Sequence, residues 1–177
     1  METAWGLGIN PALTRVHHNP EEGILFVLDP DKGRRSVTSS RDALNGYQKG
    51  RCFYCFSQIK LGGDSPPEVD HFFPQVLKNG PLGDNVDGVW NLVLACQACN
   101  RGEGGKHARV PETSLLSRLN TRNEFLISSH HPLRETLIGQ TGISAVARRD
   151  FLNSAFDEAL RVLVHTWNTT PKGPDPF

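Results

Sequence analysis

The sequence lacks the segments that would place this chain in a membrane, and it lacks an excess of charge. No run of about 18 apolar residues occurs, so nothing in it is expected to span a bilayer. Residues 1–11 lack a basic start followed by a continuous apolar segment, so we expect no secretory signal. The 19 basic and 19 acidic residues leave no formal net charge. Any attraction to nucleic acid must therefore come from local patches.

Internal repeats and low-complexity segments are also missing, and the length suits one compact domain. The chain has 177 residues, 37% of them hydrophobic and 21% charged, a composition typical of folded proteins. We expect a lead-in with one short strand (1–35), a central core (36–110), a helical extension (111–167) and a flexible tail (168–177). The expected location is the cytoplasm, where cysteines stay reduced.

Short apolar runs and turn residues predict an α+β fold with helices mainly in the C-terminal part. Strands are expected at 24–28, 69–73 and 91–95, and helices at about 40–48, from 97, from 113, from 132 and at about 144–167. In the last helix, apolar residues such as Phe151, Leu152, Ala155 and Phe156 recur at helical spacing. That stripe is interpreted as core packing.

Four cysteines form two pairs of the CxxC type, Cys52 with Cys55 and Cys96 with Cys99. Two intervening residues let a tight turn bring both sulfurs to one ion, and zinc prefers four thiolates at tetrahedral angles. In a reducing compartment the pattern predicts a closed, structural zinc site rather than two disulfides. The 40 residues between the pairs are an insertion that carries the candidate chemistry.

Charge changes sign along this region. From residue 52 to residue 99 there are two basic and five acidic residues, and a loose basic series follows. Arg101, Lys106 and Arg109 are candidate phosphate contacts, which give salt-sensitive and sequence-independent affinity. An acidic centre beside a basic flank suits a metal site next to a phosphate track, although an ordinary solvated surface has the same pattern.

The insertion contains an ordered set of polar residues: Asp70-His71 before Pro74, Asn91-Leu92 before the second cysteine pair, and Asn100 after it. Over about residues 50–106 this order resembles the HNH endonuclease family. The resemblance implies a ββα-metal core, made of two strands and a helix, inside the zinc site. It also implies a metal-dependent endonuclease that hydrolyses phosphodiester bonds.

The chemistry of these residues suits such a reaction. His71, with an ordinary pKa of about 6.5, can accept a proton from water near neutral pH. Mg²⁺ or Mn²⁺ held by Asp70 and Asn100 can neutralise charge on the phosphate and on the leaving oxygen. The resemblance implies these roles, with Asn91 fixing the loop that places His71. His107 remains an alternative ligand to Asn100, because three nearby glycines weaken the helix.

DNA is the expected substrate, RNA stays open, and the cut is either a nick or a double-strand break. One base per chain cuts one strand per event, so a double-strand cut needs two events or a homodimer. Phage defence, restriction or a mobile element would suit such an enzyme, including within a larger defence complex. The alternatives are a zinc-ribbon module that only binds nucleic acid, and a nuclease subunit that is inactive without its partner.

Overall fold

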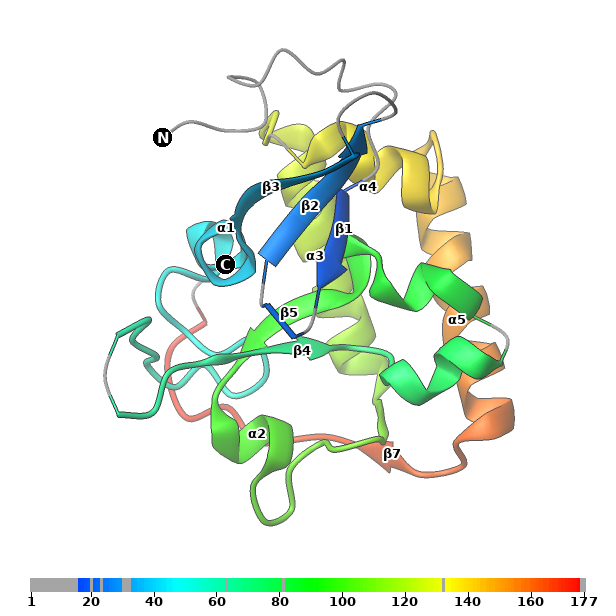
Figure 1. The fold of residues 1–177 in the computed structure, drawn as a ribbon. Coiled ribbons are helices and arrows are strands. Elements are labelled where there is room, and N and C mark those ends of the chain that lie inside the picture. Colours follow the sequence, from blue (N-terminus) through cyan, green and yellow to red (C-terminus); the bar gives the residue numbers. More distant parts are fainter. Residues whose placement is uncertain are drawn as a thin grey trace.

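The part of the chain that the structure describes folds as a mixture of helices and three small, separate sheets, in agreement with the expected α+β class (Figure 1). This computed structural model describes residues 16–19, 21–22, 24–29, 33–62, 64–80, 82–131 and 133–175. Among these residues, no helix combines the length and the apolar composition that crossing a bilayer requires.

The first sheet is antiparallel and has three strands, β1 (Val16–Asn19), β2 (Ile24–Asp29) and β3 (Gly33–Ser39), in that order. The sequence predicts only the middle strand, which carries the fully buried Leu25. β1 and β3 are polar segments without an apolar run. Their strand conformation therefore depends on pairing with β2 rather than on a hydrophobic pattern in their own sequences. The first 15 residues of the expected lead-in lie outside the described residues.

The second sheet is a two-stranded antiparallel unit of β4 (Glu68–His71) and β5 (Leu92–Ala95). The helix α1 (Ser40–Gln48) precedes this sheet in the chain. Its last residue, Gln48, contacts the edge of β5 that is not paired with β4. Gln48 donates from Nε2 to the carbonyl of Leu94 at 2.8 Å, and its Oε1 accepts the Leu94 N–H at 2.8 Å. Since this strand edge is buried, the amide supplies the partners that a third strand would otherwise give.

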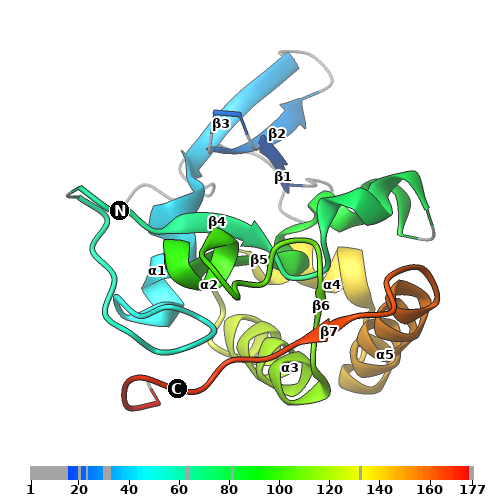
Figure 2. The same ribbon diagram turned by 90° about the horizontal axis from the view of Figure 1, so that it is seen from below.

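Three short 3₁₀ segments connect these strands: η2 (Gln75–Asn79), η3 (Gly83–Asp87) and η4 (Val89–Asn91). The helix α2 (Gln97–Arg101) begins directly after β5, where the sequence predicts a helix, and it contacts β4. Figure 2 shows the two paired strands lying between the N-terminal sheet and the C-terminal helices.

The C-terminal part consists of α3 (Thr113–Ser128), α4 (Arg134–Thr141) and α5 (Ala145–Val162). The last helix ends five residues before its expected end at residue 167. The chain then turns back, and β7 (Thr166–Trp167) pairs in parallel with β6 (Val110–Pro111). These contacts bring the end of the chain to the segment that follows α2 (Figure 1).

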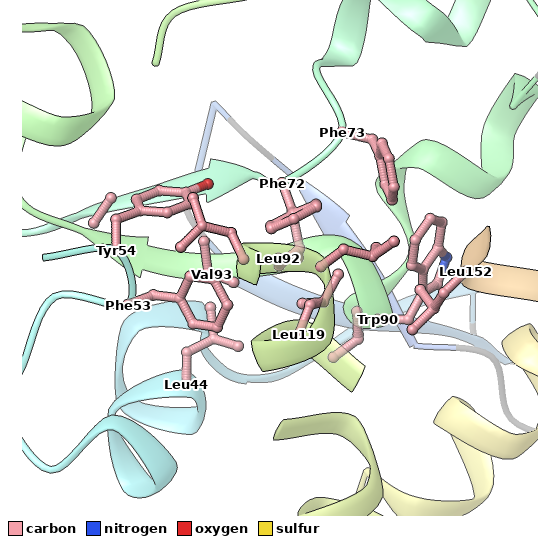
Figure 3. Close-up of a cluster of buried hydrophobic side chains, with 14 of the residues drawn as sticks. Leu44, Phe53, Tyr54, Phe72, Phe73, Trp90, Leu92, Val93, Leu119 and Leu152 are labelled. Carbon is pink, nitrogen blue, oxygen red and sulfur yellow. The ribbon is translucent and has the colours of Figure 1, made fainter. Parts of the chain in front are cut away.

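The paired strands and the C-terminal helices share one hydrophobic core (Figure 3). Phe53 from the first cysteine turn, Phe72 after β4 and Trp90 before β5 are all fully buried. Leu119 of α3 and Leu152 of α5 pack into the same cluster. Of the expected core stripe of the last helix, Leu152, Ala155 and Phe156 are buried, and Phe151 is partly buried against the core.

The tail, expected to be flexible because of its prolines, lies against the first cysteine turn. The backbone N–H of Lys172 donates to the carbonyl of Cys55 at 2.6 Å. A Cβ on Gly173 would stand 2.5 Å from the carbonyl oxygen of Phe56, so the two backbones are in close contact there. Backbone pairing of this kind leaves no signal in the side-chain pattern.

Candidate metal centre and active site

The four cysteine sulfurs meet between the first cysteine turn and the start of α2. All four Sγ atoms lie within 4.8 Å of one another, and those of Cys55 and Cys96 are 3.8 Å apart. Zinc with four Zn–S bonds of about 2.3 Å places its sulfurs about 3.8 Å apart at the corners of a tetrahedron. None of the four is in a disulfide. The arrangement fits a metal such as zinc, as the two CxxC pairs predict.

Groups of the chain contact two of the sulfurs, and the four thiols shift one another's pKa in opposite directions. The Cys96 N–H donates to Cys52 Sγ at 3.3 Å, and the Ser57 hydroxyl lies 3.0 Å from Cys55 Sγ. Hydrogen bonding with Cys52 lowers the pKa of Cys96 to about 6 and raises the pKa of Cys99. A set of four sulfurs closed on one point leaves no open position for a substrate, so a metal held there has a structural role.

Asp70 and His71 are neighbours at the end of β4, so their side chains leave on opposite faces of the strand. Asp70 is only 7% exposed. One carboxylate oxygen accepts the Tyr54 hydroxyl at 2.6 Å, and the other pairs with Lys106 Nζ at 3.3 Å. Burial raises the pKa of Asp70 and lowers the pKa of Lys106, while each charge opposes the shift of the other. Both oxygens of this carboxylate therefore have partners within the chain.

His71 is held by a carboxylate that no motif in the sequence marks. Its Nε2 lies 3.0 Å from Asp87 Oδ1 on η3, and Lys78 Nζ lies 2.6 Å from the other oxygen. Burial lowers the pKa of His71, and Asp87 acts in the opposite direction. Burial also acts to raise the pKa of Asp87, but Lys78 and His71 outweigh it and leave that pKa below its ordinary value. The result is a buried imidazole oriented by an ionised carboxylate.

Asn91 clamps the turn that follows β4. Its Oδ1 accepts the Phe73 N–H at 2.7 Å, and its Nδ2 donates to the carbonyls of Phe73 and Val86 at 3.0 and 2.8 Å. Asn91 is fully buried, so water cannot reach its amide. These three hydrogen bonds therefore supply the partners that its polar atoms would otherwise lack. Because Val86 precedes Asp87, the clamp joins the segment after His71 to the segment that carries its carboxylate.

Asn100 and the alternative ligand His107 point to other partners. Asn100 Nδ2 donates to Glu68 Oε2 at 2.8 Å, and Arg101 donates to the other oxygen of Glu68 at 2.6 Å. His107 is exposed, and its Nε2 lies 3.0 Å from the carbonyl of Gly102. The two expected divalent ligands thus have different polar partners: Tyr54 and Lys106 contact Asp70, and Glu68 contacts Asn100.

The three expected phosphate contacts have different environments. Arg101 has a side chain that is 64% exposed, paired with Glu68. Lys106 has a side chain that is only 1% exposed, so its ammonium does not face a phosphate. Arg109 donates to the carbonyls of Gly104 and Gly105 and so braces the loop after α2. The sequence signal, a basic series, does not separate a surface charge from one that folds inward.

Sequence reasoning missed Asp87 and Tyr54, which contact the two residues of the Asp-His pair. Asp87 is one of several acidic residues in a loop rich in Gly, Asn and Asp, and no spacing marks it. Tyr54 lies between the first two cysteines, and its ring packs against Phe72 and Trp167. No sequence signal marks either residue, because the need of the Tyr54 hydroxyl for a hydrogen-bond partner follows from its complete burial in the structure.

The chain matches no family model, no curated protein and no solved structure. Its function must therefore be argued from its own residues and their geometry.

Proposed function

We propose that this chain is a nuclease of the HNH type, which hydrolyses phosphodiester bonds in DNA with His71 as its general base. One observation carries the proposal: His71, at the end of a strand, is held 3.0 Å from the carboxylate of Asp87. A module that only binds nucleic acid needs no buried imidazole oriented by a carboxylate. In this proposal β4, β5 and α2 form the ββα unit, and zinc in the cysteine site closes it.

The base chemistry follows from the hydrogen bond. With the Nε2 proton donated to Asp87, the basic nitrogen of His71 is Nδ1, which takes the proton from the attacking water. The imidazolium that forms is stabilised by the negative charge of Asp87. Because burial lowers the pKa of His71, the ring is neutral and ready to act near pH 7.

The proposed divalent ion has a less favourable setting. Mg²⁺ and Mn²⁺ bind oxygen ligands of a protein and keep further coordination positions for water and substrate. The two oxygens of Asp70 are taken by Tyr54 and Lys106, and Asn100 turns its Nδ2 to Glu68. A divalent ion beside Asp70 would have to displace the Lys106 ammonium. The residues in this arrangement do not fit such an ion.

The proposed substrate is DNA, with RNA as the other candidate. Lys78 favours the approach of a polyanion to His71, because its side chain is 43% exposed and contacts Asp87, the carboxylate that also contacts His71. Arg101, the last residue of α2, adds a second exposed cation. Cleavage of both strands in one event needs two copies of the chain or a larger complex, since each chain has one proposed base.

The test is cleavage of supercoiled plasmid DNA by zinc-loaded protein, without added metal and with Mg²⁺ or Mn²⁺. We expect nicked or linear product from the wild type and a loss of about 10²-fold or more in His71→Ala. His107→Ala is the matched control, because this histidine is exposed and bonded to Gly102. It should cut as the wild type does.

Absence of cleavage in all conditions, with zinc bound and the fold intact, would overturn the proposal. Single-stranded RNA in the same assay separates a ribonuclease from a deoxyribonuclease. A chain that binds DNA without cutting it would be the zinc-stapled binding module. Cleavage that begins only when a partner is added would identify a subunit.

A further inference from the structure

The loop between α2 and β6 folds back and places a lysine in the interior of the molecule. Lys106 is the only buried lysine among the residues that the structure describes, and its ammonium pairs with Asp70 at 3.3 Å. It also donates to the carbonyl of His107 at 3.0 Å. Charged side chains are rarely buried so completely, and when they are, a specific partner explains it.

Two glycines make this return possible because the loop passes close to α2. A Cβ on Gly102 would stand 2.8 Å from both Cα and O of Ala98, and one on Gly105 would stand 2.8 Å from the same oxygen. Side chains at either position would push the loop away from the helix. The glycines that weaken the helix in the sequence thus serve to bring Lys106 to Asp70.

The loop is also tied to the cysteine site and to the end of the chain. The Lys106 N–H donates to the carbonyl of Cys99 at 2.6 Å. Trp167 Nε1 donates to the carbonyl of Gly104 at 2.8 Å, and the Trp167 ring packs edge-on against Tyr54, the other partner of Asp70. The position of the ammonium is therefore fixed from three directions.

We infer that Lys106 is the resident cation of the Asp70 site and excludes a divalent ion from it. A unit positive charge already stands beside the carboxylate, and a dication at the same place would meet its repulsion in a site from which water is largely absent. The carboxylate keeps a compensating charge without any ion from solution. The inference rests on the proposed function only for its consequence in catalysis. A nuclease with this site would not recruit Mg²⁺ or Mn²⁺ through Asp70.

The first experiment uses wild-type, zinc-loaded protein without nucleic acid. Lysines are acetylated briefly, with and without Mn²⁺ alone, and the modified positions are read by mass spectrometry. Lys106 should react about tenfold or more slowly than the exposed Lys60 and Lys172, and saturating Mn²⁺ should leave that protection unchanged. A Lys106 that becomes reactive when Mn²⁺ is added would overturn the inference.

The second experiment measures Mn²⁺ binding by electron paramagnetic resonance. Wild type should show no site that depends on Asp70, so Asp70→Asn should bind the same amount as wild type. Lys106→Met keeps the length of the side chain and removes the charge, and it should gain one Mn²⁺ that is lost again in the Lys106→Met/Asp70→Asn double variant. A wild-type Mn²⁺ site that Asp70→Asn abolishes would contradict the inference.

Folding of the variants does not limit the test, because the labelling arm needs only the wild type. The result is also separable from the proposed function. If Mn²⁺ binds at Asp70 and the protein cuts DNA, the inference fails and the site is a conventional metal site. If the protein does not cut DNA, the Mn²⁺ and labelling results still test the inference by themselves.

Discussion

Two successive residues of β4 have different environments because a strand sends neighbouring side chains to opposite faces. Asp70 faces the loop after α2 and is enclosed with Tyr54 and Lys106. His71 faces η3 and is partnered by Asp87, whose second oxygen contacts the partly exposed Lys78. Burial and Lys106 lower the pKa of His71, whereas Asp87 and Asp70 raise it. Its basicity can therefore be altered through Asp87 without a change at Asp70.

Asp87→Asn should shift the acid limb of the cleavage profile to lower pH. The general base must be neutral, so activity falls as the pH drops through the pKa of His71. Burial already lowers that pKa below about 6.5, and loss of the Asp87 charge removes the group that raises it most. The plateau should also fall about 10²-fold or more, because the imidazolium loses its partner. The measurement is kcat/KM for plasmid cleavage against pH.

Asp84→Asn is the matched control, since Asp84 also contacts Lys78, at 3.4 Å, but its side chain is 95% exposed. It should leave both limb and plateau in place. Equal profiles for the two variants would show that the contact between His71 and Asp87 has no part in the reaction.

At the scale of elements, the sequence predicts those that have a side-chain signature. The two CxxC pairs, α1 and the start of α2 are where the pattern places them. The paired strands are found but are shorter than expected at one end, because Asn91 takes the backbone groups of Phe73. The sequence does not predict β1, β3, β6 or β7, since backbone pairing specifies these polar or short segments.

The candidate site could be predicted in its residue types but not in its pairings. Asp70, His71 and Asn91 are marked by their order along the chain, whereas their partners Tyr54, Lys106 and Asp87 come from other segments. A one-dimensional pattern gives no information on which cation meets which carboxylate. Lys106 is the clearest example, because the same basic series contains the exposed Arg101.

The loop after α2 should tolerate no side chain at Gly105. Gly105→Ala places a Cβ 2.8 Å from the backbone oxygen of Ala98 and should lower the free energy of unfolding by about 1–3 kcal/mol. Gly46→Ala, within α1, meets nothing within 4 Å and should raise it by about 1 kcal/mol through helix propensity. Urea denaturation measures both. Opposite signs are the expected outcome, and two stabilised variants would mean that the loop does not pass close to α2.

Zinc removal should unfold the elements joined by the cysteines. Structural zinc contributes about 10–16 kcal/mol in finger peptides, which is comparable to the whole stability of a domain. A chelator should release about one zinc per chain, and the far-UV circular dichroism should fall with its release. Cys99→Ser should show the same loss at lower chelator concentration, whereas Ser57→Ala should differ little from wild type. A chain that melts identically with and without zinc would contradict this role.

At the scale of the whole molecule, the end of the chain completes a site formed by its centre. β7 pairs with β6, Lys172 bonds to Cys55, and Trp167 contacts both Gly104 and Tyr54. The C-terminal helices that lead to β7 share the core of the paired strands. The extension is therefore a support for the central unit, in which the position of Lys106 depends on residues far away in the sequence.

Trp167 is the residue through which this dependence can be measured. Trp167→Ala should lower the free energy of unfolding by about 3–5 kcal/mol and increase acetylation of Lys106, because both the Gly104 contact and the packing on Tyr54 are lost. Trp167→Phe keeps a ring and loses only the N–H donor, so the cost should be about 1 kcal/mol. Val164→Ala, at a position 75% exposed, should change stability by less than about 0.5 kcal/mol. If Trp167→Ala behaves like Val164→Ala, the end of the chain does not hold the loop, and Lys106 must be kept in place by its contacts with Cys99, His107 and Asp70.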